Sequence, residues 1–389
     1  MYILLFLFQI HLKIIYFILK LCIRQKKQIF FLSRQTNKPS INYQHLMNFI
    51  KKNDSSIIIR CSCKRVAENL NKKIHSSGNI KNGFSWKEGK EILLYYCLLY
   101  KQMYYLASSK MVIIDGYNIL ISCLKHRKTT KIIQIWHALA AIKKFGYQTI
   151  DRKDGISLKR AKLLHLHENY DYVLSGSDAM RKPFSEAFHI SQEKVLSIGT
   201  PYIDYLLNTK PNKIKAYKEY PCLKNKKVIL YCPTFRKNGR NVVNDIVKNI
   251  DLKKYCLVIR LHPLDSINTL EMVPEGVLMN PTIEYVTLLK IADYVITDYS
   301  ALMIEASIVK ANVLLYVYDY EKYKRENGLN MDLFKELQGC VFKNFKDLML
   351  CIENNQYNKS TLLCFRKKFI TNLEGNSTEK IYHLIRGIL

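Results

Sequence analysis

Short segments made almost entirely of apolar residues recur along the chain, and stretches with helical periodicity separate them. A strand with one wet face alternates polar and apolar residues, whereas these segments do not, so they are predicted to be buried on both faces. In the first half they lie at 29–33, 56–61, 111–116, 132–136, 170–177 and 194–199. Helices are predicted between them at 41–51 and 86–107. Strands that alternate with helices in this way form a doubly wound, mainly parallel α/β sheet.

The alternation stops once and then starts again. The stretch 208–227 is polar, rich in lysine and contains two prolines, so it is a predicted domain junction. Further strands are predicted at 227–233, 256–263, 292–300 and 312–319. We therefore expect a terminal helix at 1–27, an N-terminal domain at 28–207 and a C-terminal domain at 208–389. Two Rossmann-like α/β domains that face a cleft define the GT-B architecture, in which ligands bind at the carboxyl ends of strands.

The first residues, 1–23, are apolar and long enough to span a bilayer, which takes ~20 residues. No basic region precedes them and no small-residue cleavage site follows, so a secretory signal fits poorly. Wound as a helix at ~100° per residue, the segment gathers its polar side chains in one stripe about 60° wide. The stripe contains Gln9, Lys13, Lys20, Arg24 and Lys27. This pattern favours a helix lying in the membrane interface with its lysines on anionic head groups. A transmembrane anchor and a core helix of the first domain are the alternatives.

The formal net charge of +29 attracts polyanions such as nucleic acid, anionic lipid or an acidic polymer. The sequence has no zinc-finger spacing, no RNP-type aromatic run and no heptads behind a basic region, so we do not expect nucleic acid as a partner. The eleven cysteines show no pairing pattern and are typical of reduced thiols in the cytoplasm. Cys61 and Cys63 form a C-x-C without a second ligand pair, and no dense carboxylate cluster is present, so no metal site is expected.

Polar residues that end apolar strands are candidates for chemistry. His137 follows the strand IIQIW, and His262 ends the strand CLVIRLHP two residues after Arg260. A histidine that faces a cleft can act as a general base, because its ordinary pKa is ~6.5. A structural histidine bonded to a loop is the alternative for each. Lys143 and Lys144 follow in the loop after His137 and would face an anionic acceptor, or else form a solvated surface.

Two other strand ends carry groups suited to a nucleotide diphosphate. The strand KVILYCP ends in Thr-Phe-Arg, whose hydroxyl and guanidinium can donate to phosphate oxygens. The strand ADYVI ends in Thr-Asp-Tyr-Ser and opens a helix; these residues are either helix caps or, with the free amides, a phosphate site. Glu305, farther along that helix, could accept from a ribose or polyol hydroxyl. The candidates for the donor site are Thr234, Arg236, Arg260, Thr297, Asp298, Ser300 and Glu305.

Six motifs in a fixed order resemble those of the CDP-glycerol glycerophosphotransferase family, over about residue 29 to the C-terminus. They are WHALAAIKKFG (136–146), IGTPYID (198–204), YCPTFR (231–236), RLHP (260–263), ITDYSALMIEA (296–306) and YVYDYEKYKRENGLNMDL (316–333). Three residues depart from the family pattern: Ala138 replaces a glycine, Tyr202 replaces an arginine and Ala301 replaces a serine. The first two changes could alter contacts to the acceptor or to phosphate.

The resemblance implies a reaction. A hydroxyl of a lipid-linked glycan or of a growing polyol-phosphate chain attacks the β-phosphorus of a CDP-polyol, and CMP leaves. The resemblance makes His137 the candidate base and His262 a group near the transferred phosphate, while the donor-site candidates hold the pyrophosphate and hydroxyls. CDP-glycerol is the expected donor, with CDP-ribitol open; no cofactor is implied, and magnesium bound with the donor is left open. The expected location is the cytoplasmic face of the cell membrane, as a peripheral protein on its anionic surface.

Three alternatives remain at the level of sequence. A GT-B glycosyltransferase that uses a nucleotide sugar in capsule or cell-wall polysaccharide synthesis would share the fold and the phosphate-binding helix. A non-catalytic scaffold would account for the three departures and would release no nucleotide. Binding of nucleic acid through charge alone would show a steep dependence on salt.

Overall fold

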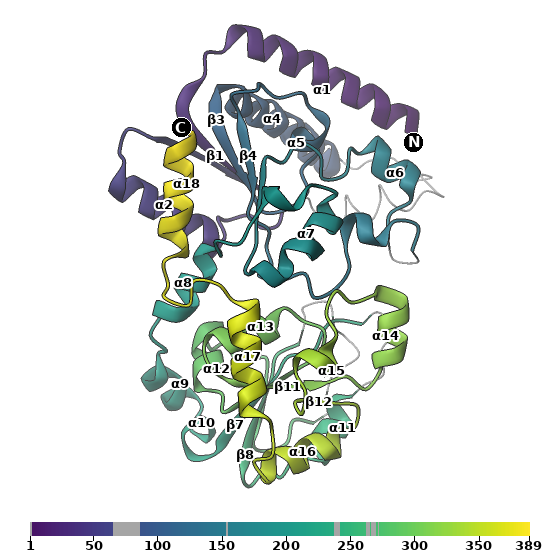
Figure 1. Ribbon diagram of the computed structural model, residues 1–389, viewed down its shortest axis with the longest axis vertical. Helices are drawn as coiled ribbons and strands as arrows, with labels where there is room; N and C mark the ends of the chain where they lie inside the picture. Colours follow the sequence, from purple (N-terminus) through teal and green to yellow (C-terminus); the bar gives the residue numbers. More distant parts are fainter. Residues whose placement is uncertain are drawn as a thin grey trace.

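The computed structural model describes residues 2–64, 86–152, 155–236, 242–261, 265, 270 and 272–389. It contains two six-stranded parallel sheets, one in each half of the chain, which Figure 1 shows one above the other. This arrangement confirms the predicted α/β fold with two doubly wound halves. The division into domains at residue 208 stays a prediction.

The N-terminal sheet has the strand order β2-β1-β3-β4-β5-β6. Its strands are β1 (Lys26–Ser33), β2 (Ile58–Cys63), β3 (Ser109–Ile114), β4 (Lys131–Gln134), β5 (Tyr172–Leu174) and β6 (Val195–Leu196). Its helices are α1 (Tyr2–Cys22), α2 (Ile41–Asn53), α4 (Trp86–Ser108), α5 (Ile119–Cys123), α6 (Leu158–Leu163), α7 (Arg181–Phe188) and α8 (Pro201–Asn208), with 3₁₀ turns at Gly146–Thr149, Asp178–Met180 and Gln192–Lys194. Every strand predicted in this half is present, although most begin or end one to three residues away.

The C-terminal sheet has the order β12-β11-β10-β7-β8-β9. Its strands are β7 (Lys227–Tyr231), β8 (Tyr255–Ile259), β9 (Val277–Met279), β10 (Tyr294–Thr297), β11 (Asn312–Tyr316) and β12 (Val341–Phe342). The helices of this half are α9 (Lys213–Glu219), α10 (Cys222–Asn225), α11 (Val243–Lys248), α12 (Tyr285–Ile291), α13 (Leu302–Ile308), α14 (Tyr320–Asn327), α15 (Leu333–Glu336), α16 (Phe345–Glu353) and α17 (Lys359–Phe369). The last helix, α18 (Ser377–Ile388), packs against α2 and α8 beside the N-terminal sheet.

Both faces of the N-terminal sheet are covered, which explains its continuous apolar strands. Side chains alternate between the two faces of a strand. In β1, Phe30 and Leu32 join the core beneath α1 and α4, whereas Ile29 and Phe31 join the core formed with α2 and α18. Burial on both sides removes any need for polar alternation, as the sequence predicted.

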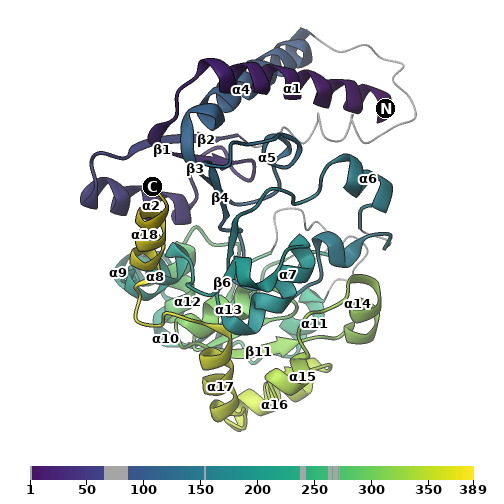
Figure 2. The same cartoon turned by 45° about the horizontal axis from the view of Figure 1, so that its top comes forward.

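Helix α1 lies along α4 on the outer side of the N-terminal sheet, as Figure 2 shows. Its stripe of polar residues is not wholly outward. Gln9 is buried and donates to the carbonyl oxygen of Leu163 at 2.7 Å, and the Lys20 ammonium donates to the carbonyl oxygen of Lys125 at 2.6 Å. Two side chains of the stripe thus bond within the protein, and the expected contact of the lysines with anionic head groups stays a prediction.

The opposite face of α1 is apolar and exposed. We call it the α1 apolar face, and it consists of Phe6, Leu7, Ile10, Ile14, Phe17, Ile18 and Leu21. The segment Leu5–Cys22 is long and apolar enough to cross a membrane by length and composition. At the same time Leu12 and Tyr16 are buried in the core, so α1 is also an integral helix of the N-terminal half.

Candidate functional site

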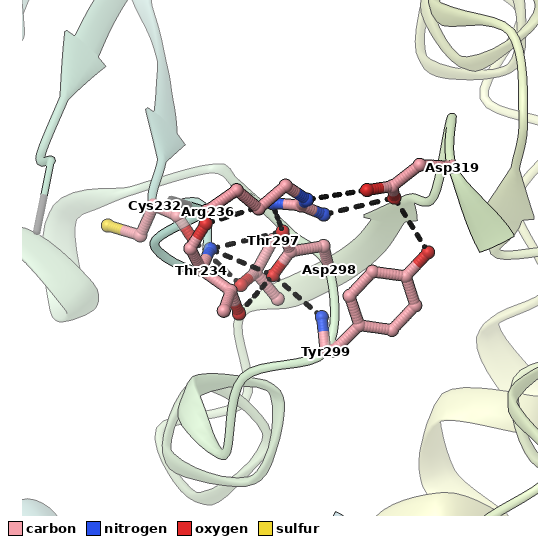
Figure 3. A network of polar contacts seen from close by, with 7 residues as sticks. All are labelled: Cys232, Thr234, Arg236, Thr297, Asp298, Tyr299 and Asp319. Carbon is pink, nitrogen blue, oxygen red and sulfur yellow. Dashed lines mark hydrogen bonds and ion pairs between the residues drawn. The ribbon is translucent and has the colours of Figure 1, made fainter. Parts of the chain in front are cut away.

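The carboxyl ends of β7 and β10 meet in a buried polar network centred on Asp298 (Figure 3). These strands are neighbours in a parallel sheet, so the loops that follow them lie at the same edge. Asp298 is 3 % exposed and accepts hydrogen bonds from the backbone N–H of Thr234 at 3.0 Å and from its hydroxyl at 2.7 Å. It also accepts from the N–H of Tyr299 at 2.6 Å and from Arg236 Nη1 at 2.7 Å. The carboxylate therefore ties two strand ends together.

Arg236 has a second carboxylate partner, Asp319, which follows β11. Its Nε and Nη2 donate to the two Asp319 oxygens at 2.6 and 3.1 Å, and Nη1 also donates to the carbonyl oxygen of Thr234 at 2.8 Å. Together with the bond to Asp298, four of the five guanidinium N–H groups are engaged within the protein. Burial lowers the pKa of Arg236, but the charges of Asp298 and Asp319 outweigh burial and raise it.

Thr297 and Ser300 complete this edge of the sheet. The Thr297 hydroxyl is buried and donates to the carbonyl oxygen of Cys232 at 2.7 Å. The Ser300 hydroxyl accepts a hydrogen bond, at 3.2 Å, from the backbone N–H of Leu302, the first residue of α13. The structure thus brings the predicted donor-site residues of these two strand ends together, and it shows that their side chains bond chiefly to one another. A direct role in donor binding stays a prediction.

His137 lies after β4 at the corresponding edge of the N-terminal sheet. Its Nδ1 is 3.2 Å from the backbone carbonyl oxygen of Asp115, which follows the neighbouring strand β3. A carbonyl oxygen can only accept, so Nδ1 carries the proton and Nε2 has a lone pair available. Burial of the ring lowers the pKa of His137, and the bond to Asp115 partly opposes this. The imidazole is therefore neutral near pH 7, which is the form that a general base requires.

Aromatic packing fixes the loop that carries His137. Trp136 has a left-handed backbone, with φ of 54°, which is unusual for a bulky residue. Its indole stacks on Phe145 with ring centroids 4.8 Å apart and meets Phe188 edge to face at 5.1 Å. The ring centroids of His167 and Phe188 lie 4.8 Å apart. Burial lowers the pKa of His167 to about 3. This neutral, buried histidine supports the loop; no motif in the sequence singled it out.

Lys143 extends from this loop to the polar network of the C-terminal half. Its ammonium lies 5.7 Å from the centre of the Tyr323 ring, and burial lowers the pKa of Lys143 while the charge of Asp298 opposes the shift. Lys144 donates its backbone N–H to the carbonyl oxygen of Gly328 at 3.2 Å. Both lysines thus lie where the two halves meet, and their predicted contact with an acceptor stays a prediction.

The segments 328–330 and 141–144 join the two halves of the protein, and we call this contact the latch. Lys143 and Leu329 make an antiparallel bridge, and the N–H of Asn330 donates to the carbonyl oxygen of Ile142 at 2.9 Å. Gly328 has φ of 72°, a left-handed backbone that glycine adopts without strain and that other residues rarely adopt.

The side chain of Asn330 holds the latch. Its amide nitrogen donates to the carbonyl oxygens of Ala141 at 2.9 Å and Lys143 at 3.3 Å, and it exchanges hydrogen bonds with the Gln148 amide at 2.8 and 3.0 Å. Asparagine is among the few residues that offer two donors and an acceptor in one short side chain. The partners are some 180 residues away in sequence, so no local pattern could have identified them.

Asn330→Ala should lower turnover by on the order of tenfold or more, because the loop that carries Lys143 and His137 loses its anchor and small misplacements of reacting groups are costly. Asn327→Ala is the matched control, since among the described residues the Asn327 side chain donates only to the carbonyl oxygen of Tyr323 in its own helix, at 3.5 Å. Steady-state rates of both variants, measured with their melting temperatures, make the comparison. Equal rates for the two variants would show that the latch does not position the site.

Of the remaining predicted residues, Arg260 and Glu305 are described by the structure and His262 is not. Arg260 donates to the carbonyl oxygen of Ile283 at 3.2 Å, and its guanidinium lies over the Tyr285 ring at 5.6 Å. Glu305 accepts hydrogen bonds from Tyr285 and Tyr202. His262 lies outside the described residues, and its predicted role near the phosphate stays a prediction.

Comparisons with known proteins identify the family to which this chain is similar. Residues 14–387 match the profile described as "CDP-Glycerol:Poly(glycerophosphate) glycerophosphotransferase". The chain is 30 % identical over 305 residues to a teichoic acid ribitol-phosphate primase of Bacillus spizizenii, covering 75 % of this chain and 78 % of the relative. It is 29 % identical over 299 residues to a teichoic acid glycerol-phosphate primase of Bacillus subtilis, covering 75 % and 77 %.

Solved structures support the same fold. The wall teichoic acid polymerase TagF superposes with a TM-score of 0.64 at 19 % identity, over 94 % of this chain and 89 % of that chain. The UDP-GlcNAc 2-epimerase of Neisseria meningitidis superposes with a TM-score of 0.57 at 15 % identity, over 92 % and 100 % of the two chains. At these identities the likeness concerns the arrangement of the two sheets and their helices.

Proposed function

Because the chain belongs to the CDP-glycerol:poly(glycerophosphate) glycerophosphotransferase family, we propose that its donor is CDP-glycerol and that it adds glycerol phosphate to a teichoic-acid-type acceptor. Polyol-phosphate transfer in teichoic acid synthesis is the activity of the family. The choice of glycerol rests on the family profile, since glycerol- and ribitol-phosphate primases match at nearly the same identity. A lipid-linked glycan or a growing polyol-phosphate chain supplies the acceptor hydroxyl.

The observation that carries the proposal is the contact of 3.2 Å between His137 Nδ1 and the backbone carbonyl oxygen of Asp115. Because this oxygen can only accept, Nδ1 keeps its proton and Nε2 takes the proton of the acceptor hydroxyl. The hydroxyl oxygen then forms a bond to the β-phosphorus, the bond from that phosphorus to the bridging oxygen breaks, and CMP leaves with the electron pair. Lys143 lies at the meeting of the two halves and offsets the negative charge that spreads over the phosphoryl oxygens.

The direct test is CMP release by purified protein incubated with a lipid-linked acceptor and, in separate reactions, CDP-glycerol, CDP-ribitol and a UDP-sugar. We expect acceptor-dependent CMP from CDP-glycerol. Acceptor-dependent CMP only from CDP-ribitol would replace the proposed donor. Nucleotide release only from the UDP-sugar would favour the glycosyltransferase hypothesis, and no release by folded protein would favour a scaffold.

The α1 apolar face supports peripheral docking on the membrane. Its side chains stand together on one side of the helix, while Lys13 and Arg24 are exposed at its margins and can reach anionic head groups. On the adjacent helix α4, Leu93 and Leu94 are also exposed. An apolar surface of this kind is unfavourable in water, and insertion into the acyl region of a membrane offsets that cost. Docking at the cytoplasmic face would bring the enzyme to a lipid-linked acceptor.

Replacing Phe6, Ile14, Phe17 and Leu21 with serine should weaken binding to anionic vesicles by more than about 100-fold, since each buried side chain contributes ~1.5–3 kcal/mol. These side chains are exposed, so the melting temperature of the variant should equal that of the wild type. Deletion of 1–21 is a poorer test, because it also removes the buried Leu12.

The control carries Ile214→Ser and Leu363→Ser, two exposed apolar residues of the C-terminal half. Vesicle co-sedimentation with and without anionic lipid gives the measurement. Unchanged sedimentation of the fourfold variant would contradict docking through α1.

A further inference from the structure

Both tyrosine hydroxyls that reach Glu305 bind the same carboxylate oxygen. Tyr285 of α12 donates to Oε2 at 2.8 Å, and Tyr202 of α8 donates to Oε2 at 3.2 Å. In the described part of the chain, no donor is directed at the other oxygen, Oε1. A carboxylate has about four acceptor sites, so the described residues satisfy one oxygen of this group and leave the other open.

The open oxygen lies beside the polar network already described. Glu305 is half-buried on α13, the helix that begins just after Asp298 and Ser300. Cys232 at the end of β7 is close enough for the charge of Glu305 to raise the pKa of its thiol, after the larger effect of burial. Glu305 therefore faces the same edge of the C-terminal sheet as the donor-site candidates.

We propose that Tyr202 and Tyr285 are positioning residues that hold Glu305 by one oxygen so that the other accepts a hydrogen bond from a hydroxyl of the cytidine-nucleotide donor. This inference rests on the proposed function. An ionised carboxylate repels phosphate and accepts from hydroxyl groups, so the ligand group here is a hydroxyl of either the ribose or the polyol.

The electrostatics agree with this role. Burial raises the pKa of Glu305 to about 6, and the hydrogen bonds from Tyr285 and Tyr202 oppose the rise. The ionised form is thus present at neutral pH, at a desolvation cost that a ligand hydroxyl offsets. Of the other polar groups packed around it, Arg260 lies over the Tyr285 ring, and Arg366 of α17 donates to the carbonyl oxygen of Ile308 at the far end of α13.

Tyr202 links this carboxylate to the N-terminal half. Its backbone N–H donates to the side-chain oxygen of Asn42 on α2 at 2.8 Å, and α8 packs against α2, α13 and α18. The position of the N-terminal half therefore determines whether the Tyr202 hydroxyl reaches Glu305. Donor affinity is in this way coupled to the contact between the two halves.

Tyr202→Phe should weaken donor binding about tenfold, because Glu305 loses one of the two hydrogen bonds that hold its carboxylate in place. Tyr285→Phe should weaken it similarly, with kcat nearly unchanged in both. Tyr205→Phe is the matched control: it lies on the same helix, stacks on Tyr202 at 5.9 Å and donates to Glu284 instead. Calorimetric titration with CMP and KM for CDP-glycerol give the two readouts.

The pH dependence separates positioning from a merely structural role. The tyrosine hydroxyls favour ionised Glu305, so their removal raises its pKa further. Donor affinity is retained above that pKa and lost as the pH falls through it, so the loss should begin at higher pH in Tyr202→Phe than in the wild type. A structural defect would lower the affinity equally at every pH.

The two ligands identify the hydroxyl. CMP contains the ribose without the polyol, so weaker CMP binding by Tyr202→Phe assigns the ribose, whereas weaker binding of CDP-glycerol alone assigns the polyol. A Tyr202→Phe variant that matches Tyr205→Phe in affinity and pH dependence would overturn the inference. Wild-type protein that binds CMP but releases none from CDP-polyols would instead contradict the proposed function alone.

Discussion

Replacing His137 with alanine should lower the rate of CMP release by at least about 100-fold, because the acceptor hydroxyl loses its proton acceptor. The affinity for CMP should change little, since His137 belongs to the N-terminal sheet and the donor-site candidates follow strands of the other sheet. The backbone oxygen of Asp115 that holds the ring remains in the variant. The expected result is thus a loss in kcat with binding preserved.

The wild-type pH profile adds to this test. The ordinary pKa of histidine is ~6.5, and that of His137 is lowered. We therefore expect kcat to stay high as the pH falls to ~6.5 and to decline only at lower pH, where the ring becomes protonated. The control for His137→Ala is His383→Ala, because His383 is an exposed histidine on α18, near Glu379. An unchanged rate in folded His137→Ala would remove this residue from the role of base.

Asp298→Asn should destabilise the protein by ~3–5 kcal/mol and abolish turnover. Removal of one partner from a buried ion pair leaves the other charge uncompensated. The new amide would also direct a donor at the N–H of Thr234 or at Arg236, where the carboxylate now accepts. Chemical denaturation monitored by circular dichroism measures the loss.

The matched control for Asp298→Asn is Glu321→Gln. Glu321 pairs with Lys343 at 2.8 Å on the surface, where both side chains are more than half exposed and water screens the charges. Its midpoint of denaturation should equal that of the wild type. If Asp298→Asn were as stable as this control, the network would not hold the ends of β7 and β10 together.

The sheets were predictable because burial on both faces has a simple signature. The largely apolar segments of β1, β3, β7 and β10 favour strands buried on both faces, and their order along the chain indicated two doubly wound halves. The strands β9 and β12 were not predicted, since Val277–Met279 and Val341–Phe342 are too short to show a pattern.

The orientation of α1 was only partly predictable. Its two faces are evident from the spacing of Gln9, Lys13 and Lys20. Periodicity does not reveal which face meets the protein, because that depends on partners such as the carbonyl oxygens of Leu163 and Lys125, far away in sequence. Polar groups that bond to the protein then leave the apolar face outside.

The candidate site was also only partly predictable. The sequence made Thr234, Arg236 and Asp298 candidates for one donor site, and in the structure their side chains do meet. The second carboxylate of Arg236, Asp319, was not predicted, because it follows a third strand and lies 83 residues away. The departure at Tyr202 was expected to alter contacts to phosphate or acceptor; in the structure its hydroxyl bonds to Glu305.

The central claim is that this chain joins a polyol phosphate to a lipid-linked acceptor with His137 as base. The most direct measurement is the mass spectrum of a synthetic lipid-linked glycan after incubation with CDP-glycerol and either wild-type protein or His137→Ala. We expect the wild type to add the mass of glycerol phosphate, with one CMP released for each unit, and the variant to leave the acceptor unchanged. An acceptor unaltered by the wild type, or equally altered by the variant, would contradict this account.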